Sequence, residues 1–298
     1  KRIPRFDGRE KVTGQAQYVA DIALPNMLYG KILRSPYPHA RILNIDASRA
    51  ESLPGVKAVV TGKDSPKTYN FGIDIYDEPL LAWDNIVRFV GQEVAGVAAV
   101  DKETAAEALE LIKVDYEPLP AVLDMEEAMK PGAPQVHPEL SHINNNIAFE
   151  STMERGDIRR GFAEADAIVE ENFEVAPVTQ CYMEPDGCIA SYDASGRLTV
   201  QVGNMWPSLM RDELARTLQM PVSKIRVLQK YVGGAFGARF TMYPMHFISS
   251  LLSMKTGRPV KIVRTRTEEF TIPRYRPEVR THFRMGARKD GIITAIET

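Results

Sequence analysis

The stretch KIRVLQKYVGGAFGARFTMYPMHFISSLLSMKTG, residues 224–257, carries the strongest fold signal in the chain. KIRVLQK alternates like a strand, and YVGGAFGARF is a glycine-rich turn. TMYPMHFISSLLSMK has the spacing of an amphipathic helix that ends at Gly257. A strand, a glycine turn and a helix N-terminus can direct several backbone N–H groups toward one place, which favours an anion or an oxo ligand. On spacing alone, a tight structural turn remains the alternative, because Gly233-Gly234-x-x-Gly237 matches neither the dinucleotide fingerprint nor the phosphate-binding loop.

Strands and one helix are expected upstream of this stretch. AIVEENFEVAPV, CIASYD and LTVQVGN read as strands, and Ser195-Gly196 has the composition of a hairpin turn. A helix is expected from about Pro207, with apolar residues four apart, closed by Pro221. Further downstream, GIITAIET reads as a strand at residues 291–298.

The first 120 residues predict a small domain of mixed strands and helix. LYGKILRS and GVKAVVTG read as strands, and VRFVGQEVAGVAAV reads as two buried strands broken at a glycine. Asp101 is placed to N-cap a helix, KETAAEALELI, which an extended segment follows. The pattern is βαβ-like.

A proline-rich boundary follows this region. Prolines occur at positions 118, 120, 131, 134 and 138, and three asparagines at 144–146. We therefore expect an α+β (mixed α/β) chain with a domain at 1–130, a linker at 131–148 and a second domain at 149–298.

The composition excludes several classes of protein. The chain has 298 residues, with 37 Lys and Arg against 39 Asp and Glu, a net charge of −2. Such a chain does not hold nucleic acid through bulk charge, and no stretch reaches the ~20 apolar residues of a membrane span. The two cysteines, Cys181 and Cys188, cannot build a disulfide framework. We expect both to be buried and inert, and we assign no residue as a metal ligand.

The glycine-rich stretch resembles a known family. VGGAFGAR resembles the GGGFG loop of the molybdenum hydroxylases, the xanthine dehydrogenase and aldehyde oxidase family. DGREKVTGQAQYVADIALPNMLYGKILRSPYPHARI and FVGQEVAGVAAVDKETAAEALELIKVDYEPLPAV resemble its hammerhead domain. CYMEPDGCIA and TGRPVKIVRTRTEEFTIPRYRP resemble the first part of its molybdopterin-binding domain. The resemblance covers essentially the whole chain and is strongest to the large subunits of bacterial nicotinate dehydrogenase and 4-hydroxybenzoyl-CoA reductase.

The resemblance implies a site and a cofactor. The cofactor would be molybdopterin carrying molybdenum, with or without an attached nucleotide, and no protein ligand would bind the metal. The cofactor-binding residues would be Gly233, Gly234, Ala235, Phe236, Gly237, Ala238, Arg239, Asn204 and Met205. Phe240 and Trp206 would face the substrate, although core packing is an equal reading of the two aromatics. Two residues depart from the family: Ala235 replaces a glycine, and Met205 replaces a side chain that donates a hydrogen bond.

The resemblance also implies an activity shared among chains. The family oxidises a heteroaromatic, aldehyde or related carbon of a small molecule, takes oxygen from water and passes electrons to 2Fe-2S clusters and FAD. Its general-base glutamate lies beyond the equivalent of Thr298, so we assign no catalytic residue here. We expect partner chains: a second molybdopterin-half subunit that carries the glutamate, an iron–sulfur subunit and an FAD subunit, all cytoplasmic. The alternative is a non-catalytic structural subunit that has kept the fold.

Three other features have competing readings. Glu184 reads either as an acid with a raised pKa or, as we favour, as a structural carboxylate paired with an arginine. His39 reads as a turn histidine whose hydrogen bonds are satisfied. The eleven Lys and Arg between Lys255 and Lys289 read either as a clamp for phosphates or an acidic substrate, or as solvated strand faces with interchain ion pairs, which we favour.

Overall fold

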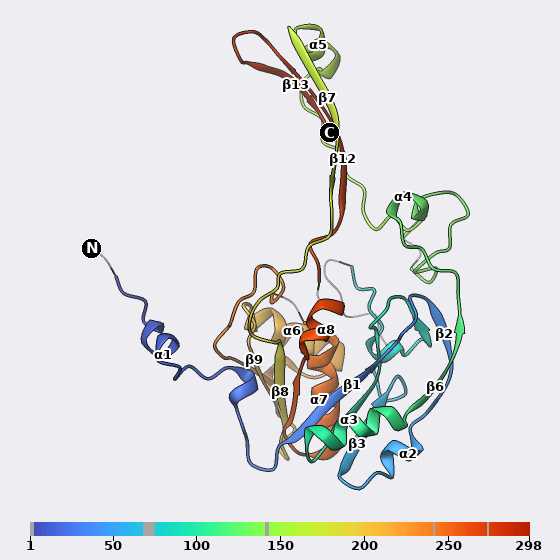
Figure 1. Ribbon diagram of the computed structural model, residues 1–298, viewed down its shortest axis with the longest axis vertical. Coiled ribbons are helices and arrows are strands. Elements are labelled where there is room, and N and C mark those ends of the chain that lie inside the picture. Colours follow the sequence, from blue (N-terminus) through green and yellow to red (C-terminus); the bar gives the residue numbers. More distant parts are fainter. Residues whose placement is uncertain (1–2, 68–74, 141–142, 241, 273) are drawn as a thin grey trace. The chain divides into compact units, whose positions relative to one another are not determined.

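The computed structural model describes residues 3–67, 75–140, 143–240, 242–272 and 274–298, and it has the mixed α and β character expected (Figure 1). The chain divides into two compact units. Unit 1 comprises residues 1–146 and 181–273, and unit 2 comprises residues 147–180 and 274–298.

Unit 1 is built on a seven-stranded sheet of order β10-β9-β8-β11-β1-β5-β3. Its strands are β10 (Ile225–Gln229), β9 (Leu198–Val202), β8 (Gly187–Tyr192), β11 (Val260–Val263), β1 (Leu28–Arg34), β5 (Glu93–Ala99) and β3 (Val56–Thr61). β1 pairs parallel with β11, with Leu28 opposite Val260. Strands from both halves of the chain therefore share one sheet.

Helices cover both faces of this sheet. α6 (Pro207–Leu218) and α7 (Pro244–Thr256) pack on one face, and α2 (Ser48–Glu51) and α3 (Lys102–Leu111) on the other. The alternation of strand side chains explains this division. On β3, Ala58 and Val60 join the core that includes α7, whereas Val59 between them joins the core that includes α3.

The helix α7 is buried on nearly all sides, so the expectation of an amphipathic helix was wrong. Its serines are buried with the apolar residues and donate to backbone carbonyls: Ser249 to Val260 at 2.8 Å and Ser253 to Arg258 at 2.8 Å. These serines satisfy backbone carbonyls in the region where α7 meets β11. In a hydropathy pattern the same serines resemble the polar face of an amphipathic helix.

A small second sheet of order β4-β2-β6 completes unit 1. It contains β4 (Ile86–Val87), β2 (Ala40–Asp46) and β6 (Lys113–Pro118). The expected βαβ pattern is therefore wrong as a single-sheet unit, because α3 connects β5 of the large sheet to β6, which pairs antiparallel with β2. The remaining helices of unit 1 are short: α1 (Gly8–Val12), α4 (Met125–Ala128), α8 (Arg266–Thr271) and the 3₁₀ turns Val19–Asp21, Leu80–Ala82 and Val222–Lys224.

Unit 2 is an antiparallel sheet of order β13-β12-β7 with one helix. Its elements are β7 (Ala167–Val175), β12 (Val279–Ala287), β13 (Ile293–Glu297) and α5 (Ile158–Ala163). Gly161 allows α5 to approach β13, since a Cβ there would lie 2.4 Å from the carbonyl oxygen of Thr294.

Local sequence signals predicted several element ends correctly. The carboxylate of Asp101 accepts the Thr104 N–H at 2.7 Å and caps α3. Pro207 begins α6, and Gly257 ends α7 with a φ of 63°. Among the described residues, no helix has the length and apolar character needed to cross a bilayer.

Candidate cofactor site at the glycine-rich loop

The glycine-rich loop follows β10 and has an unusual backbone. Gly234 and Gly237 have φ values of 111° and 92°, and Phe236 has a φ of 50°. Glycine tolerates these values, whereas a residue with a side chain does so at a cost. At Gly234 a Cβ would also lie 2.9 Å from the Cβ of Tyr182. Glycine therefore suits positions 234 and 237, and Phe236 is the loop residue whose conformation its own side chain disfavours.

Four consecutive amides of this loop have no acceptor among the residues that the structure describes. The Gly233 N–H donates to Oε2 of Glu184 at 2.6 Å, and the Ala238 N–H donates to the carbonyl of Ala235 at 2.9 Å. Between them, within the same described part of the chain, the N–H groups of residues 234–237 make no hydrogen bond to protein. All four residues are at least partly solvent-exposed. A row of accessible N–H donors is suited to an anionic or oxo-bearing ligand.

The N-terminus of α7 does not add to this row, contrary to the sequence expectation. Its first residue, Pro244, has no N–H and is buried. The Tyr243 N–H is within 2.9 Å of Nδ1 of His246, and Oε2 of Glu213 accepts the Met242 N–H at 3.2 Å. The N–H groups without an acceptor therefore belong to the loop and not to the N-terminus of α7.

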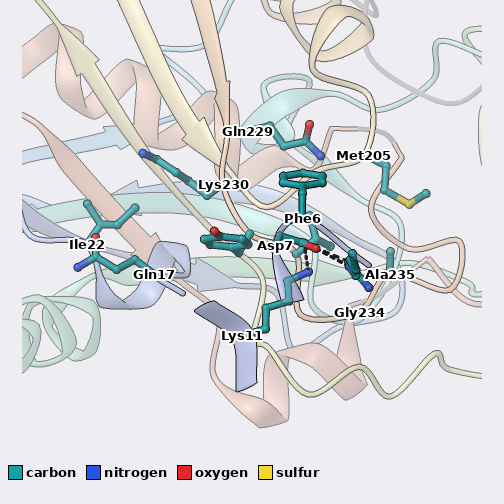
Figure 2. Close-up of a pocket in the computed structure, with 13 residues that line it drawn as sticks. Phe6, Asp7, Lys11, Gln17, Ile22, Met205, Gln229, Lys230, Gly234 and Ala235 are labelled. Atoms are coloured by element: carbon teal, nitrogen blue, oxygen red, sulfur yellow. Dashed lines mark hydrogen bonds and ion pairs between the residues drawn. The ribbon is translucent and has the colours of Figure 1, made fainter. Parts of the chain in front are cut away.

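An open groove of about 820 Å³ lies against the loop (Figure 2). Met205, Gly234 and Ala235 lie on one side of it, and Gln17 and Ile22 on the opposite side. The other lining residues come from the N-terminal segment, from the last residue of β10 and from the residues that follow it: Arg5, Phe6, Asp7, Lys11, Gln229, Lys230, Tyr231 and Val232. Sequence reasoning missed this lining, because only the fold brings residues 5–22 to the loop.

The N-terminal segment is bound to a residue just ahead of the loop. The hydroxyl of Tyr231 donates to the carboxylate of Glu10, and the ring of Tyr18 packs at a tilt against that of Tyr231 with 6.1 Å between ring centroids. Asp7 pairs with Arg5 at 2.5 Å and Lys11 at 2.8 Å. The hydrogen bond from Arg5, followed by that from Lys11, lowers the pKa of Asp7 to about 2. The described groove lining therefore carries three cationic side chains, Arg5, Lys11 and Lys230, against the one carboxylate of Asp7.

The other predicted residues lie around the groove in different environments. Phe236 is 76% exposed, whereas Ala238 is fully buried. Asn204 is buried, and its Oδ1 accepts the Trp206 N–H at 2.8 Å. Trp206 and Phe240 form an edge-to-face pair with centroids 6.0 Å apart. The two aromatics contact each other but are absent from the described lining of this groove.

Glu184 pairs with an arginine, as we favoured, and the arginine is Arg239. Both side chains are buried, and Nη1 of Arg239 donates to Oε2 of Glu184. The other terminal nitrogen of Arg239 donates to the carbonyl of Glu184. Burial raises the pKa of the Glu184 carboxyl, and the nearby Arg239 charge opposes that rise.

A wider buried network surrounds this pair and was not predicted. Oε1 of Glu269 accepts the Asp186 N–H at 2.5 Å, and Oε2 accepts the hydroxyl of Tyr182. The guanidinium of Arg264 stacks 4.0 Å from the ring centroid of Tyr243. Burial, followed by the charge of Asp186, raises the pKa of the Tyr182 hydroxyl far above its usual range. In the sequence, Glu184 of the MEPDG motif was the one residue that indicated a buried charged group here.

The cysteines differ from each other. Cys188 is fully buried, and burial raises the pKa of its thiol to about 12, as expected for an inert residue. Cys181 is exposed, so the expectation that it is buried was wrong. It lies in an irregular segment ahead of β8, with a φ of 48°. Among the described residues, no group of three or more His, Cys, Asp or Glu could hold a metal ion.

His39 has the satisfied turn environment that was expected. Its Nδ1 lies 2.6 Å from the carbonyl of Pro120.

Several Lys and Arg side chains of the basic stretch from Lys255 to Lys289 bind acceptors of the same chain. Lys261 donates to the carbonyls of Ala20 and Ile22 at 2.9 and 2.8 Å. Other members pair with carboxylates of the same chain: Lys255 with Asp64, Arg280 with Glu278, Arg284 with Glu170 and Arg288 with Glu164. These ion pairs are thus intrachain, where we had expected interchain pairs.

Two family models match the chain. The molybdopterin cofactor-binding domain matches residues 136–298, and the aldehyde oxidase and xanthine dehydrogenase a/b hammerhead domain matches residues 13–120. The chain belongs to the molybdenum hydroxylase family of xanthine dehydrogenases and aldehyde oxidases, and it has a hammerhead domain followed by a molybdopterin-binding domain.

Individual relatives agree with this assignment. The chain is 39% identical to a probable xanthine dehydrogenase subunit of Bacillus subtilis, covering 98% of this chain and 38% of that protein. It is 36% identical to the nicotinate dehydrogenase large molybdopterin subunit of Eubacterium barkeri, covering 100% and 68%. The solved structure of reconstituted CO dehydrogenase from Oligotropha carboxidovorans superposes with a TM-score of 0.87 at 32% identity, covering 99% and 38%. The chain thus spans between about two fifths and two thirds of these relatives.

Proposed function

We propose that this chain binds molybdopterin against the glycine-rich loop and forms the molybdopterin-binding part of a molybdenum hydroxylase. The observation that carries the proposal is the row of four N–H groups at residues 234–237, which have no acceptor in the described part of the chain and belong to residues that are at least partly exposed. The family model that matches this part of the chain is a molybdopterin cofactor-binding domain. The oxo and pterin oxygens of that cofactor are acceptors that these N–H groups would bind.

The residues present fit such a group. At Gly237 a Cβ would meet nothing within 4 Å, so space is left beside the loop. Met205, Gly234 and Ala235 line the groove on the loop side. We assign cofactor contacts to Gly234, Ala235, Phe236, Gly237 and Met205, and indirect roles to Gly233, Ala238, Arg239 and Asn204.

When bound, the molybdenum cofactor supplies oxygen transfer from water to a substrate carbon, together with the acceptance of two electrons. The loop amides of this chain would bind and orient its oxygens. Trp206 and Phe240 would form an aromatic wall for a heteroaromatic, aldehyde or related small molecule. We further propose a cytoplasmic complex with a second molybdopterin-half subunit that carries the general-base glutamate, an iron–sulfur subunit and an FAD subunit.

One observation supports a second candidate, a structural subunit without catalysis. The side chain of Met205 lines the groove and cannot donate a hydrogen bond there. In that case the complex would carry its molybdenum elsewhere, and substitutions at this loop would leave its metal content unchanged.

Replacing Gly237 by alanine tests the proposal. A side chain at this positive φ costs roughly 1–2 kcal/mol and projects into the space beside the loop. The matched control is Gly291→Ala, since Gly291 has a φ of 87° and equally open surroundings but belongs to the turn between β12 and β13 in unit 2. We expect Gly237→Ala to lower the molybdenum content of the purified complex, measured by plasma mass spectrometry, and Gly291→Ala to leave it unchanged. Equal content in both variants contradicts the assignment of the loop.

A further inference from the structure

A buried ion pair lies beneath the glycine-rich loop without lining the groove. Glu184 and Arg239 are 8% and 1% exposed, and neither contributes to the described groove lining. A buried ion pair is weak support for stability, because desolvation offsets most of the attraction. Stability alone therefore does not explain why Glu184 and Arg239 form a buried pair at this position.

The pair fixes both ends of the segment that carries the accessible amides. At the entrance, Oε2 of Glu184 accepts the Gly233 N–H at 2.6 Å, and the Glu184 N–H donates to the Gly233 carbonyl at 3.4 Å. At the exit, Arg239 donates to the same carboxylate, and its own carbonyl accepts the Met205 N–H at 2.8 Å. One carboxylate thus connects the start of the loop to its end and, through the carbonyl of Arg239, to Met205, which lines the groove on the same side as the loop.

The packing leaves the loop entrance little freedom. A Cβ at Gly233 would lie 2.4 Å from the Cβ of Glu184, so the backbone rests directly on this side chain. The segment that follows contains Phe236 with a φ of 50°, a conformation that persists only where the surroundings impose it. The Gly233–Glu184 hydrogen bond supplies that constraint at the start of the loop, and the Arg239–Glu184 ion pair supplies it at the end.

We propose that Glu184 and Arg239 are positioning residues that hold the amides of residues 234–237, together with Met205, in the geometry that receives the cofactor. Neither side chain touches the cofactor; each acts through the backbone of Gly233, Arg239 or Met205. This inference rests on the proposed function.

The test compares two matched substitutions in the holoenzyme purified with its partners. Glu184→Gln removes the negative charge, while its amide oxygen can still occupy the position of Oε2 and accept from Gly233 and Arg239 as a weaker, neutral acceptor. Glu93→Gln is the control: Glu93 is 5% exposed and pairs with Arg34 at 2.6 Å in β5, away from the loop. We expect the amides of Gly233 and Met205, which the pair holds through hydrogen bonds, to exchange about tenfold faster in Glu184→Gln because their anchor loses its negative charge, and at an unchanged rate in Glu93→Gln. Molybdenum content should fall only in Glu184→Gln.

A second variant keeps the proposal open to refutation if Glu184→Gln does not fold. Arg239→Lys keeps a buried cation beside the carboxylate but cannot bridge Oε2 and the Glu184 carbonyl with two fixed nitrogens. We expect an intermediate increase in the exchange of the Gly233 and Met205 amides. Unchanged exchange at Gly233 and Met205 in whichever of these variants fold overturns the positioning role, even if metal content changes. A wild-type complex without molybdenum overturns the proposed function instead, while the exchange comparison still decides the role of the pair.

Discussion

At the scale of single residues, His246 is held neutral inside unit 1. It is 1% exposed, and burial lowers its pKa to about 4 from the usual 6.5. The negative charge of Asp186 opposes this effect, and the positive charges of Arg264 and Arg239 add to it. Because the unfolded chain binds a proton between pH 6.5 and about 4 and the folded chain does not, stability falls as the pH falls through that window.

This effect gives a prediction for His246→Asn, which removes the titration and keeps an acceptor close to the Tyr243 N–H. The wild-type chain should lose about 3 kcal/mol more of its free energy of unfolding than the variant between about pH 7 and pH 4. Urea unfolding at several pH values measures the difference. Parallel pH profiles would show that His246 is not held neutral.

The sequence predicted the chemistry of single residues in the site better than their contacts. Glu184 was expected to pair with an arginine, and it does. The partner could not be chosen, because Arg239 lies 55 residues away and only the fold brings the two together. The roles of Met205 and Ala235 toward a cofactor stay predictions, since they depend on a ligand geometry that sequence does not encode.

At the scale of elements, the contact between α7 and β5 depends on a glycine. At Gly96 a Cβ would lie 2.5 Å from Cγ2 of Ile248 and 3.2 Å from Cγ2 of Val60. Gly96→Ala should therefore lower the free energy of unfolding by about 1–3 kcal/mol through overpacking. The loss should be smaller in an Ile248→Ala background, where the space is released.

The comparison needs a glycine without such crowding. Gly8→Ala is suitable, because a Cβ there would meet its nearest neighbour, the Cβ of Arg5, at 3.7 Å. It should have little effect in the same denaturant titration. Additive effects of Gly96→Ala and Ile248→Ala would show that the helix and strand do not meet as described.

Element positions were largely predictable because their signals are local. The Asp101 cap, the start of α6 at Pro207 and the Gly257 stop each depend on a few neighbouring residues. The error on α7 has a tertiary cause: its serines satisfy carbonyls of Val260 and Arg258, a use that no periodicity reveals.

At the scale of the whole molecule, the large sheet joins segments that the family models assign to different domains. β1, β5 and β3 lie within residues 13–120, whereas β8, β9, β10 and β11 lie within residues 136–298. The two segments contact each other through the parallel pairing of β1 with β11 and through the packing of α7 on β3 and β5. Pairing between strands so distant in sequence leaves no local pattern, so the sequence did not predict the shared sheet.

The shared sheet predicts how the chain behaves when it is cut. A site-specific protease sequence inserted at Gly132, where a Cβ would meet nothing within 4 Å, allows cleavage between the two family-model segments. We expect the two fragments to stay together in native buffer, because separating them would expose the core that Ala58 and Val60 share with α7. Size-exclusion chromatography before and after cleavage measures this, with protease-treated chain lacking the site as control. Fragments that elute apart without denaturant would mean that the two segments fold as independent domains and that the β1–β11 pairing contributes little to stability.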